Sequence, residues 1–285
     1  MKIDQKKDPL SILRYFGGKY YYLNHLFPFP SHQSYYEPFL GSGVVFLNKH
    51  PSTPSFLNDG YKPLMLFFQA IKDDYKKVQA SCLPYSRCDK RQFQEVITIC
   101  EHPDDYVIEE VAAAFLCLNS FSFSGGNASW KGNVYNPKRS RHALFGVQLS
   151  KLGAISRSLQ RAELTALPFE EFFASIPDRR DVFVYCDPPY YHGGKRYARA
   201  KGFTEGTWSQ SDFDTLWAMI DAFQKTKFTI SIDKHHSEIL AGDQWHSDPF
   251  SRNQFFGAKK GRTNVKKSTE FVIRNWSPTS LFSFL

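Results

Sequence analysis

The sequence predicts an α/β fold with a ligand site at the carboxyl edge of its sheet, and three observations support this prediction. A run of β-branched and aromatic residues, 182–186, ends at Asp187-Pro188-Pro189-Tyr190, where the two prolines must stop a strand. A strand-like run at 35–40 leads through a Gly-Ser-Gly turn, 41–43, into a helical pattern. Helix and strand patterns alternate again at 211–232. Ligands bind at the carboxyl ends of strands in open α/β sheets, so the polar residues that follow these runs are the candidate site.

The first element is a short aromatic and glycine segment, Tyr-Phe-Gly-Gly-Lys at 15–19, before a predicted helix over 23–27. Lys19 would stand at the start of that helix, where a positive charge opposes the helix dipole. We therefore expect Lys19 to serve a ligand carboxylate.

The glycine turn and the next strand form a predicted nucleoside site. Gly41 and Gly43 allow positive φ and close backbone approach. The strand-like run 54–59 ends at Asp59, which is placed to accept hydrogen bonds from ribose hydroxyls. The turn lacks the third glycine of a dinucleotide fingerprint, and the chain has no Gly-Lys-Ser/Thr phosphate loop, so the ligand is neither a dinucleotide nor a triphosphate. A helix with apolar residues at 64, 67, 68 and 71 should pack back on the sheet.

The residues after 186 suit chemistry on the amino group of a nucleobase. Asp187 and the Pro188 carbonyl can accept hydrogen bonds from its N–H groups and stabilise positive charge that develops on nitrogen. Tyr190 can stack on a base rotated out of its helix. The competing interpretation of this short string is a strand-terminating turn with a capping aspartate.

Composition limits the other functions. The chain has 285 residues, 42% of them hydrophobic, which is enough for a sizeable core, and its net charge of +8 favours a polyanionic partner such as nucleic acid. No apolar stretch approaches the roughly 20 residues of a membrane-spanning helix, and residues 1–8 lack the apolar segment of a secretory signal. The five scattered cysteines have no metal or disulfide spacing, so we expect reduced, buried thiols in a cytoplasmic protein.

Four motifs together carry a specific resemblance: Tyr-Phe-Gly-Gly-Lys at 15–19, Glu-Pro-Phe-Leu-Gly-Ser-Gly at 37–43, Asn-Asp at 58–59 and Asp-Pro-Pro-Tyr at 187–190. In this order and spacing the chain resembles the Dam-type DNA adenine-N6 methyltransferases (D12 class, alpha group) over nearly its whole length. Weaker matches lie at 118–121, 202–204 and 270–275. The resemblance implies a Rossmann-like, S-adenosylmethionine-dependent methyltransferase fold with a seven-stranded sheet and an inserted target-recognition domain. We place the catalytic domain at 1–61 and 153–285 and the insertion at 62–152.

The resemblance also implies roles for matching positions. The cofactor, S-adenosyl-L-methionine, would be bound by Tyr15, Lys19, Glu37, Phe39, Gly41, Gly43, Asp59 and Asp187. The catalytic residues would be Asp187, Pro188 and Tyr190. No metal is implied. Two positions depart from the family pattern, because Tyr15 stands where Trp is usual and Leu-Pro-Phe at 167–169 replaces an acid–aromatic pair near the donor adenine.

DNA contacts are predicted in the insertion and after the catalytic motif. The insertion should contain helices over 93–99 and 107–118 and then a loop or hairpin over 120–142. Asn and Arg suit adenine and guanine edges, and Lys and Arg suit phosphates. The candidate DNA-binding residues are Asn127, Trp130, Lys131, Asn133, Lys138, Arg139, Arg141, Lys195 and Arg196. Further on, Ser211 is the predicted cap of the helix before strand 228–232, and the basic run 259–267 is the predicted turn of a closing hairpin near DNA.

The function that follows is direct methyl transfer to N6 of a flipped-out adenine in double-stranded DNA, without a covalent enzyme intermediate. Cytosine N4 and RNA adenine are alternative acceptors for the same geometry, as is a protein glutamine amide, and a catalytically inactive DNA-binding protein of the same fold is the alternative from another class. We expect a monomer in the cytoplasm, associated with the nucleoid. A separate cognate restriction endonuclease is a further candidate partner.

Overall fold

The computed structural model describes residues 8–15, 17–52, 54–122, 141–189, 208–233, 244–259 and 262–277. Seven strands form one sheet in the order β3-β2-β1-β4-β5-β7-β6, which confirms the predicted seven-stranded α/β fold. The strands are β1 Ser34–Glu37, β2 Ser55–Asn58, β3 Ala162–Thr165, β4 Val182–Cys186, β5 Lys227–Asp233, β6 His246–Lys259 and β7 Arg262–Arg274. The first five strands pair in parallel, whereas β7 is antiparallel to both β5 and β6.

Alternating side chains of the central strands reach two separate hydrophobic clusters. In β1, Tyr35 belongs to one cluster and Tyr36 to the other. In β4, Phe183 and Tyr185 point to the first cluster, and the residues between and beside them point to the second. A sheet with two buried faces needs helices on both of them, and this explains why the strands have almost continuous apolar sequences.

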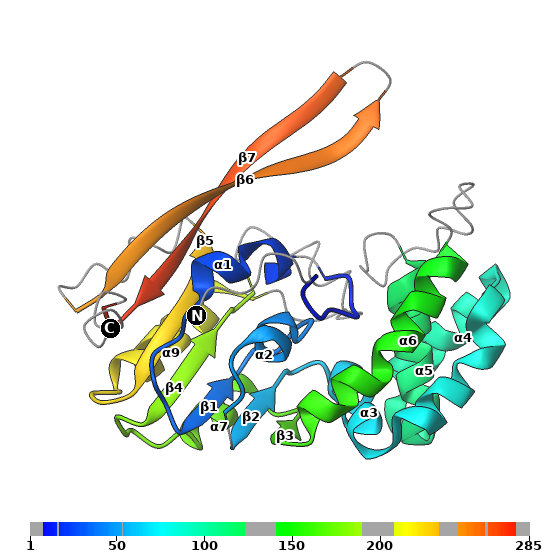
Figure 1. Cartoon of the computed structure of the whole chain (residues 1–285), viewed down its shortest axis with the longest axis horizontal. Coiled ribbons are helices and arrows are strands. Elements are labelled where there is room, and N and C mark those ends of the chain that lie inside the picture. Colours follow the sequence, from blue (N-terminus) through cyan, green and yellow to red (C-terminus); the bar gives the residue numbers. More distant parts are fainter. Residues whose placement is uncertain are drawn as a thin grey trace.

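Helices cover both faces. On the side of the first cluster lie η1 Lys19–Tyr22, α1 Leu23–Leu26, α2 Val44–Asn48, α3 Lys62–Ser81, α5 Ile108–Phe121 and α6 Arg141–Leu159. On the other side lie α7 Phe169–Ala174 and α9 Gln210–Asp221. The remaining helices are η2 Leu83–Arg87, α4 Lys90–Glu101 and η3 Pro103–Asp105. Figure 1 shows α3, α4, α5 and α6 gathered beyond one edge of the sheet. No helix of the described residues is long and apolar enough to cross a membrane.

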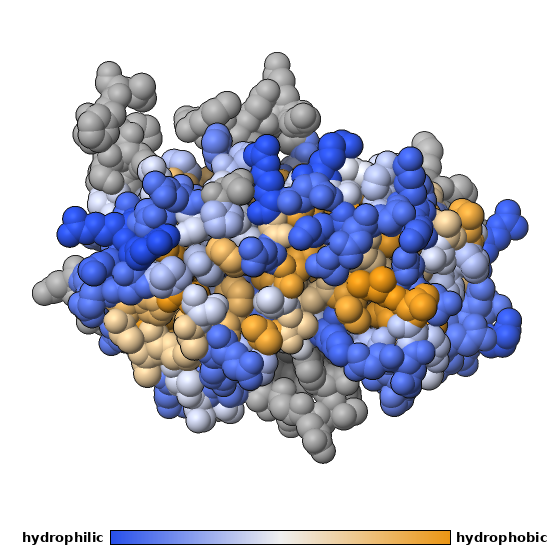
Figure 2. Space-filling view, turned by 90° about the horizontal axis from the view of Figure 1, so that it is seen from below, coloured by the Kyte–Doolittle hydropathy of each residue, from blue (hydrophilic) through white to orange (hydrophobic). Residues whose placement is uncertain are grey.

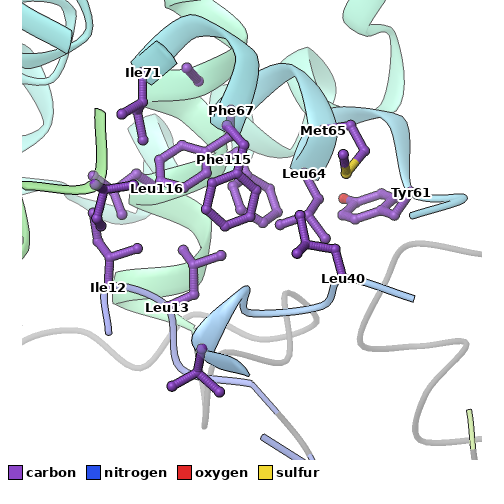
Figure 3. Packing of buried hydrophobic residues seen from close by; sticks show 14 of the residues in the cluster. Ile12, Leu13, Leu40, Tyr61, Leu64, Met65, Phe67, Ile71, Phe115 and Leu116 are labelled. Carbon is purple, nitrogen blue, oxygen red and sulfur yellow. The ribbon is translucent and has the colours of Figure 1, made fainter. Parts of the chain in front are cut away.

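The helices of the predicted insertion share their core with the sheet. Figure 3 shows side chains of α3 and α5 meeting the amino-terminal segment and the glycine turn: Leu64, Met65, Phe67 and Ile71 of α3, Phe115 and Leu116 of α5, Ile12, Leu13 and Leu40. The expected packing of the helix after Asp59 against the sheet side is therefore found. The hydrophobic core is thus continuous across residue 62. The domain boundaries at 61/62 and 152/153 stay a prediction.

Two local predictions differ from the structure. Ser209, and not Ser211, caps α9, because the Ser209 side chain accepts from the Asp212 N–H while the Asp212 carboxylate accepts from the Ser209 N–H. This is a capping box, in which the third residue after the cap must be acidic or an amide. The closing hairpin is also longer than predicted, since most of the run 259–267 lies in paired strands. Figure 1 shows this β6–β7 hairpin extending well beyond the rest of the molecule.

Hydrophilic residues cover much of one face of the molecule (Figure 2). Figure 2, a view from below Figure 1, shows hydrophobic residues reaching this face only in limited patches. All five cysteines are free and buried, as expected, and burial raises the pKa of the Cys82 thiol to about 12. The described cysteines are therefore unreactive thiols of the core.

Candidate active site

The turn between β1 and α2 exposes backbone where a ligand can approach. Gly41 and Gly43 have φ of 51° and 68°, in the left-handed region that side chains with a Cβ avoid. A Cβ on Gly41 would lie 3.3 Å from Cε1 of the Tyr15 ring, and one on Gly43 would lie 3.2 Å from Cζ of Phe68. Glycine is thus required at both positions by conformation and by space.

Asp59 holds this turn against the end of β2. Its Oδ2 accepts a hydrogen bond from Gly41 N at 2.9 Å, and its Oδ1 accepts one from Tyr61 N at 3.0 Å. Next to it, the buried Asn58 amide donates to the carbonyls of Pro38 and Leu167 at 3.2 and 3.0 Å. A carboxylate has about four acceptor sites, and Asp59 uses one oxygen for each of these two backbone groups.

We predict that Gly41→Ala lowers the free energy of unfolding by about 1–3 kcal/mol, because alanine must adopt a positive φ and press on Tyr15. Gly60→Ala is the matched control, since no atom lies within 4 Å of its added Cβ. Urea denaturation of both variants measures the difference. Equal stability of the two variants would contradict the assigned strain.

Lys19 joins the amino-terminal segment to two carboxylates from distant strands. Its Nζ lies 2.7 Å from Asp187 Oδ1 and 3.8 Å from Glu270 Oε2, and it donates to the Gly17 carbonyl at 2.8 Å. The Lys19 side chain is only 2% exposed, compared with 23% for that of Asp187. Lys19 thus contacts protein carboxylates in this structure, and its role toward a ligand carboxylate stays a prediction.

Glu270 has no role in the sequence prediction. It is buried in β7, opposite Asp233 of β5, and the antiparallel pairing brings it to the carboxyl edge of β5. A single acidic residue before the apolar run 271–273 is the only signal that the sequence offers for it. Burial of a carboxylate requires a compensating charge, and Lys19 supplies it.

Glu37, at the end of β1, belongs to a second buried polar group. The Tyr35 hydroxyl donates to its Oε2 at 2.6 Å, and the ammonium of Lys49 lies 4.2 Å from the centroid of the Tyr35 ring. Burial raises the pKa of Glu37 to about 8, and the charges of Asp187 and Asp59 act in the same direction. The hydrogen bond from Tyr35 and the charge of Lys49 lower that pKa but do not offset burial. Glu37 is therefore mainly protonated at neutral pH.

These elements enclose one pocket with an empty volume of about 460 Å³. Seven of the eight residues predicted to bind the cofactor line it, namely Tyr15, Lys19, Glu37, Phe39, Gly41, Asp59 and Asp187. Gly43 is not among the lining residues and is the N-cap of α2, while Pro188 is buried beside the pocket residue Pro189. The described residues contain no group of three or more His, Cys, Asp or Glu side chains able to hold a metal ion.

An aromatic group lies next to the pocket where the sequence departs from the family pattern. The ring centroid of Phe39 is 5.8 Å from that of Phe169 and 5.5 Å from that of Trp208, and those two rings are 5.1 Å apart. The segment 167–169 is held there by the Asn58 side chain, which bonds both the N–H and the carbonyl of Leu167. Trp208 was not foreseen, because nothing in the sequence links it to Phe39.

The predicted DNA-contacting residues fall largely outside the described part of the chain. These are Asn127, Trp130, Lys131, Asn133, Lys138, Arg139, Lys195 and Arg196, and the predicted base-stacking residue Tyr190 lies outside it as well. For these nine residues the sequence prediction stands as made.

Arg141 is described, and it lies in the interior. It is 7% exposed, and its Nη1 donates to the carbonyls of Ser120 and Ser122 at 2.7 and 2.6 Å. Arg14 donates to the Asn119 carbonyl at 2.8 Å and also to that of Ser120. Both guanidiniums thus satisfy the carbonyl end of α5, where the helix dipole favours positive charge. We correct the prediction accordingly and leave Arg141 out of the DNA contacts, because its donors bind backbone inside the fold.

Comparisons with known proteins agree with this geometry. The model of the D12 class N6 adenine-specific DNA methyltransferase family matches residues 15–254. A DNA adenine methylase of Vibrio cholerae serotype O1 (strain ATCC 39315) is 24% identical over 277 residues, covering 94% of this chain and 92% of that protein. A DNA adenine methylase of Haemophilus influenzae is 24% identical over 90% of this chain and 86% of its own. The DNA N-6-adenine-methyltransferase of Escherichia phage P1 is 25% identical over 71% of this chain, which spans 26% of that larger protein.

Proposed function

We propose a catalytic assignment for the pocket from the premise that this chain belongs to the D12 class N6 adenine-specific DNA methyltransferase family. The chain is an adenine-specific DNA methyltransferase, and its partner is DNA. The assignment concerns which residues hold the methyl donor, which hold the base and how the reaction is assisted. The observation that carries it is that Asp187 and the glycine turn line the same pocket.

The pocket suits S-adenosyl-L-methionine, the usual donor of methyltransferases. Its lining contains three carboxyl groups, of Glu37, Asp59 and Asp187, and one cation, Lys19, which complements a ligand with a sulfonium and an ammonium group. The Gly41 backbone has no Cβ to obstruct the ligand, and Asp59 lines the pocket with a carboxylate, the group that accepts hydrogen bonds from ribose hydroxyls. When bound, the donor supplies a methyl group activated on positively charged sulfur.

Asp187 and the Pro188 carbonyl orient the adenine amino group. We propose that each of these two groups accepts a hydrogen bond from one N6 hydrogen. The nitrogen lone pair is then directed at the methyl group. Lys19 fixes Asp187 Oδ1 in place, so the carboxylate needs little reorganisation as positive charge develops on N6. The surplus N6 proton then leaves by way of Asp187. We propose that the Tyr190 ring stacks on the face of the flipped base. One such stacking contact contributes roughly 1–3 kcal/mol.

The DNA surface is assigned to the segment 123–140, the residues after Tyr190 and the β6–β7 hairpin. The net charge of +8 supports phosphate contacts, and the hairpin in Figure 1 reaches far enough from the body to meet a duplex. We further propose double-stranded DNA as the substrate, a monomeric enzyme, and a cytoplasmic location associated with the nucleoid. A separate restriction endonuclease stays a prediction of the sequence alone.

The decisive experiment is incubation with unmethylated genomic DNA and labelled S-adenosylmethionine, followed by nucleoside analysis and mapping of modified positions by long-read sequencing. We expect N6-methyladenine at one short motif. Label in N4-methylcytosine would overturn the assignment of the base. Absence of label in DNA with label in RNA would overturn the substrate, and donor binding without any transfer would support the inactive alternative.

Donor affinity should depend on pH through Glu37. The pKa of Glu37 is about 8 before a ligand binds, so a cationic donor must displace its proton below that pH. Affinity for S-adenosylmethionine should therefore rise with pH by at most about tenfold per unit up to pH 8 and then level off. The rise ends above pH 8 because Glu37 is then already ionised before the donor binds.

Calorimetry of donor binding without DNA, in two buffers of different protonation enthalpy, counts the protons released. Glu37→Gln is the matched variant, because glutamine can still accept the Tyr35 hydrogen bond. It should bind the donor with a flat pH profile. The same pH dependence in wild type and in this variant would assign the proton to another group.

A further inference from the structure

A second pocket, outside the proposed donor site, lies between the end of α2 and the end of α6. Its empty volume is about 780 Å³. It is lined by Phe46, Leu47, Lys49, Pro51, Ser52, Ala154, Arg157, Ser158 and Arg161. Figure 1 shows the carboxyl end of α6 reaching the neighbourhood of α2 and β3. The pocket flanks the starts of β2 and β3, whereas Asp59 follows the end of β2, roughly 13 Å away along a four-residue strand.

The charges of this second pocket are all positive. Of its nine lining residues, three are cations, two carry hydroxyl groups and none is acidic. Within the described residues, no carboxylate forms an ion pair with Lys49, Arg157 or Arg161. Three neighbouring cations without a carboxylate repel one another, and an anion bound between them would remove that repulsion.

Lys49 makes the pocket more than an exposed basic patch. Its side chain is 7% exposed, and its ammonium donates only to neutral oxygens, the His50 carbonyl at 3.1 Å and the Ser52 hydroxyl. A buried ammonium that hydrogen-bonds only to neutral oxygens has lost much of its solvation, and Glu37, the carboxyl that acts on its charge, is not within ion-pair distance of it. A phosphate oxygen beside Lys49 would therefore be a strong partner. Burial also lowers the pKa of Lys49, and a bound anion would reverse this shift.

Arg157 and Arg161 are placed to bind a phosphate group. They are four positions apart at the end of α6, and the Arg161 carbonyl accepts from Ser55 N at 3.2 Å, which ties its backbone to the start of β2. Guanidinium groups bind phosphate through two parallel hydrogen bonds. The lining also contains three apolar residues, Phe46, Leu47 and Pro51. Such residues can pack against the ring of an organic phosphate.

We propose that this pocket binds a phosphate-bearing small molecule, of the size and chemistry of a nucleoside diphosphate. Inorganic pyrophosphate shares the recognised group but lacks the ring. The proposed ligand does not occupy the donor pocket, since the two pockets share no lining residue.

The test is calorimetric titration of the whole protein with guanosine diphosphate and, separately, with inorganic pyrophosphate. Guanosine diphosphate is chosen so that the proposed adenosine pocket does not compete. The double variant Arg157→Ala/Arg161→Ala should bind both probes at least tenfold more weakly than wild type. The control Arg87→Ala/Arg91→Ala, which removes two exposed guanidiniums elsewhere, should stay within twofold of wild type. Tighter binding of guanosine diphosphate than of pyrophosphate would support the organic ligand.

Three results would overturn the proposal. The first is no binding of either probe by the wild-type protein. The second is an equal loss in both double variants, which would indicate a general charge effect. The third is unchanged probe binding together with weakened binding of a DNA duplex, which would assign these arginines to DNA. Equal melting temperatures of the two double variants ensure that any loss of binding is not a loss of folding.

Discussion

Asp187→Ala should reduce methyl transfer by about a thousandfold or more and leave DNA affinity within a few fold of wild type. The carboxylate lines the donor pocket and is held by Lys19, so its removal takes away the acceptor proposed for the N6 hydrogens. Loss of one preorganised group that stabilises developing charge costs about 10²–10³ in rate, and the proton acceptor is lost with it. DNA affinity depends mainly on Lys and Arg contacts to phosphate and is therefore retained. Single-turnover transfer of labelled methyl groups and fluorescence anisotropy of a labelled duplex measure the two effects.

Two further variants make this test specific. Asp187→Asn keeps the shape and one oxygen acceptor but removes the charge, so it should show most of the loss. Asp181→Ala changes an aspartate at the opposite end of the same strand, paired with Arg179 at 3.2 Å, and should transfer at the wild-type rate. Transfer by Asp187→Ala at more than a tenth of the wild-type rate would refute the proposed site.

Lys19→Met should lower the free energy of unfolding by about 3 kcal/mol and also impair transfer. Without the ammonium, the carboxylates of Asp187 and Glu270 lose the positive charge that lies 2.7 and 3.8 Å from them. Breaking a buried ion pair by removing one partner is costly because the remaining charge stays desolvated. Urea denaturation gives the stability, and the transfer assay gives the activity.

The double variant Lys19→Met/Glu270→Gln separates these two consequences. Removing the Glu270 charge relieves the repulsion, so part of the lost stability should return, and the two substitutions should be non-additive by about 1 kcal/mol or more. Activity should not return, because Asp187 still lacks the group that orients it. Additive stabilities would mean that Lys19 and Glu270 are not coupled, and restored activity would mean that Lys19 acts only by balancing charge.

Much of the sheet and pocket could be predicted from short stretches of sequence. The strands at 34–37, 55–58, 182–186 and 227–233 follow from apolar and β-branched runs bounded by turn residues. Gly41 and Asp59 could be placed at one site because the ends of neighbouring parallel strands share a sheet edge. The cap of α9 was misplaced by two residues, since serines at 209 and 211 both precede the helical pattern and each has an aspartate at the third position after it, so only the structure identifies Ser209 as the cap.

The residues that were missed or misassigned depend on contacts between distant parts of the chain. Glu270 reaches Lys19 across 251 positions only because β7 inserts antiparallel between β5 and β6. Arg141 has the composition of a DNA contact, yet the end of α5 takes its donors. Residue type and local period are therefore sufficient to identify the strands, the glycine turn and the chemistry available at the edge of the sheet. The packing decides which charges pair and which basic side chains remain available to bind a ligand. A buried charge pairs with whichever partner the folded chain brings within a few ångströms.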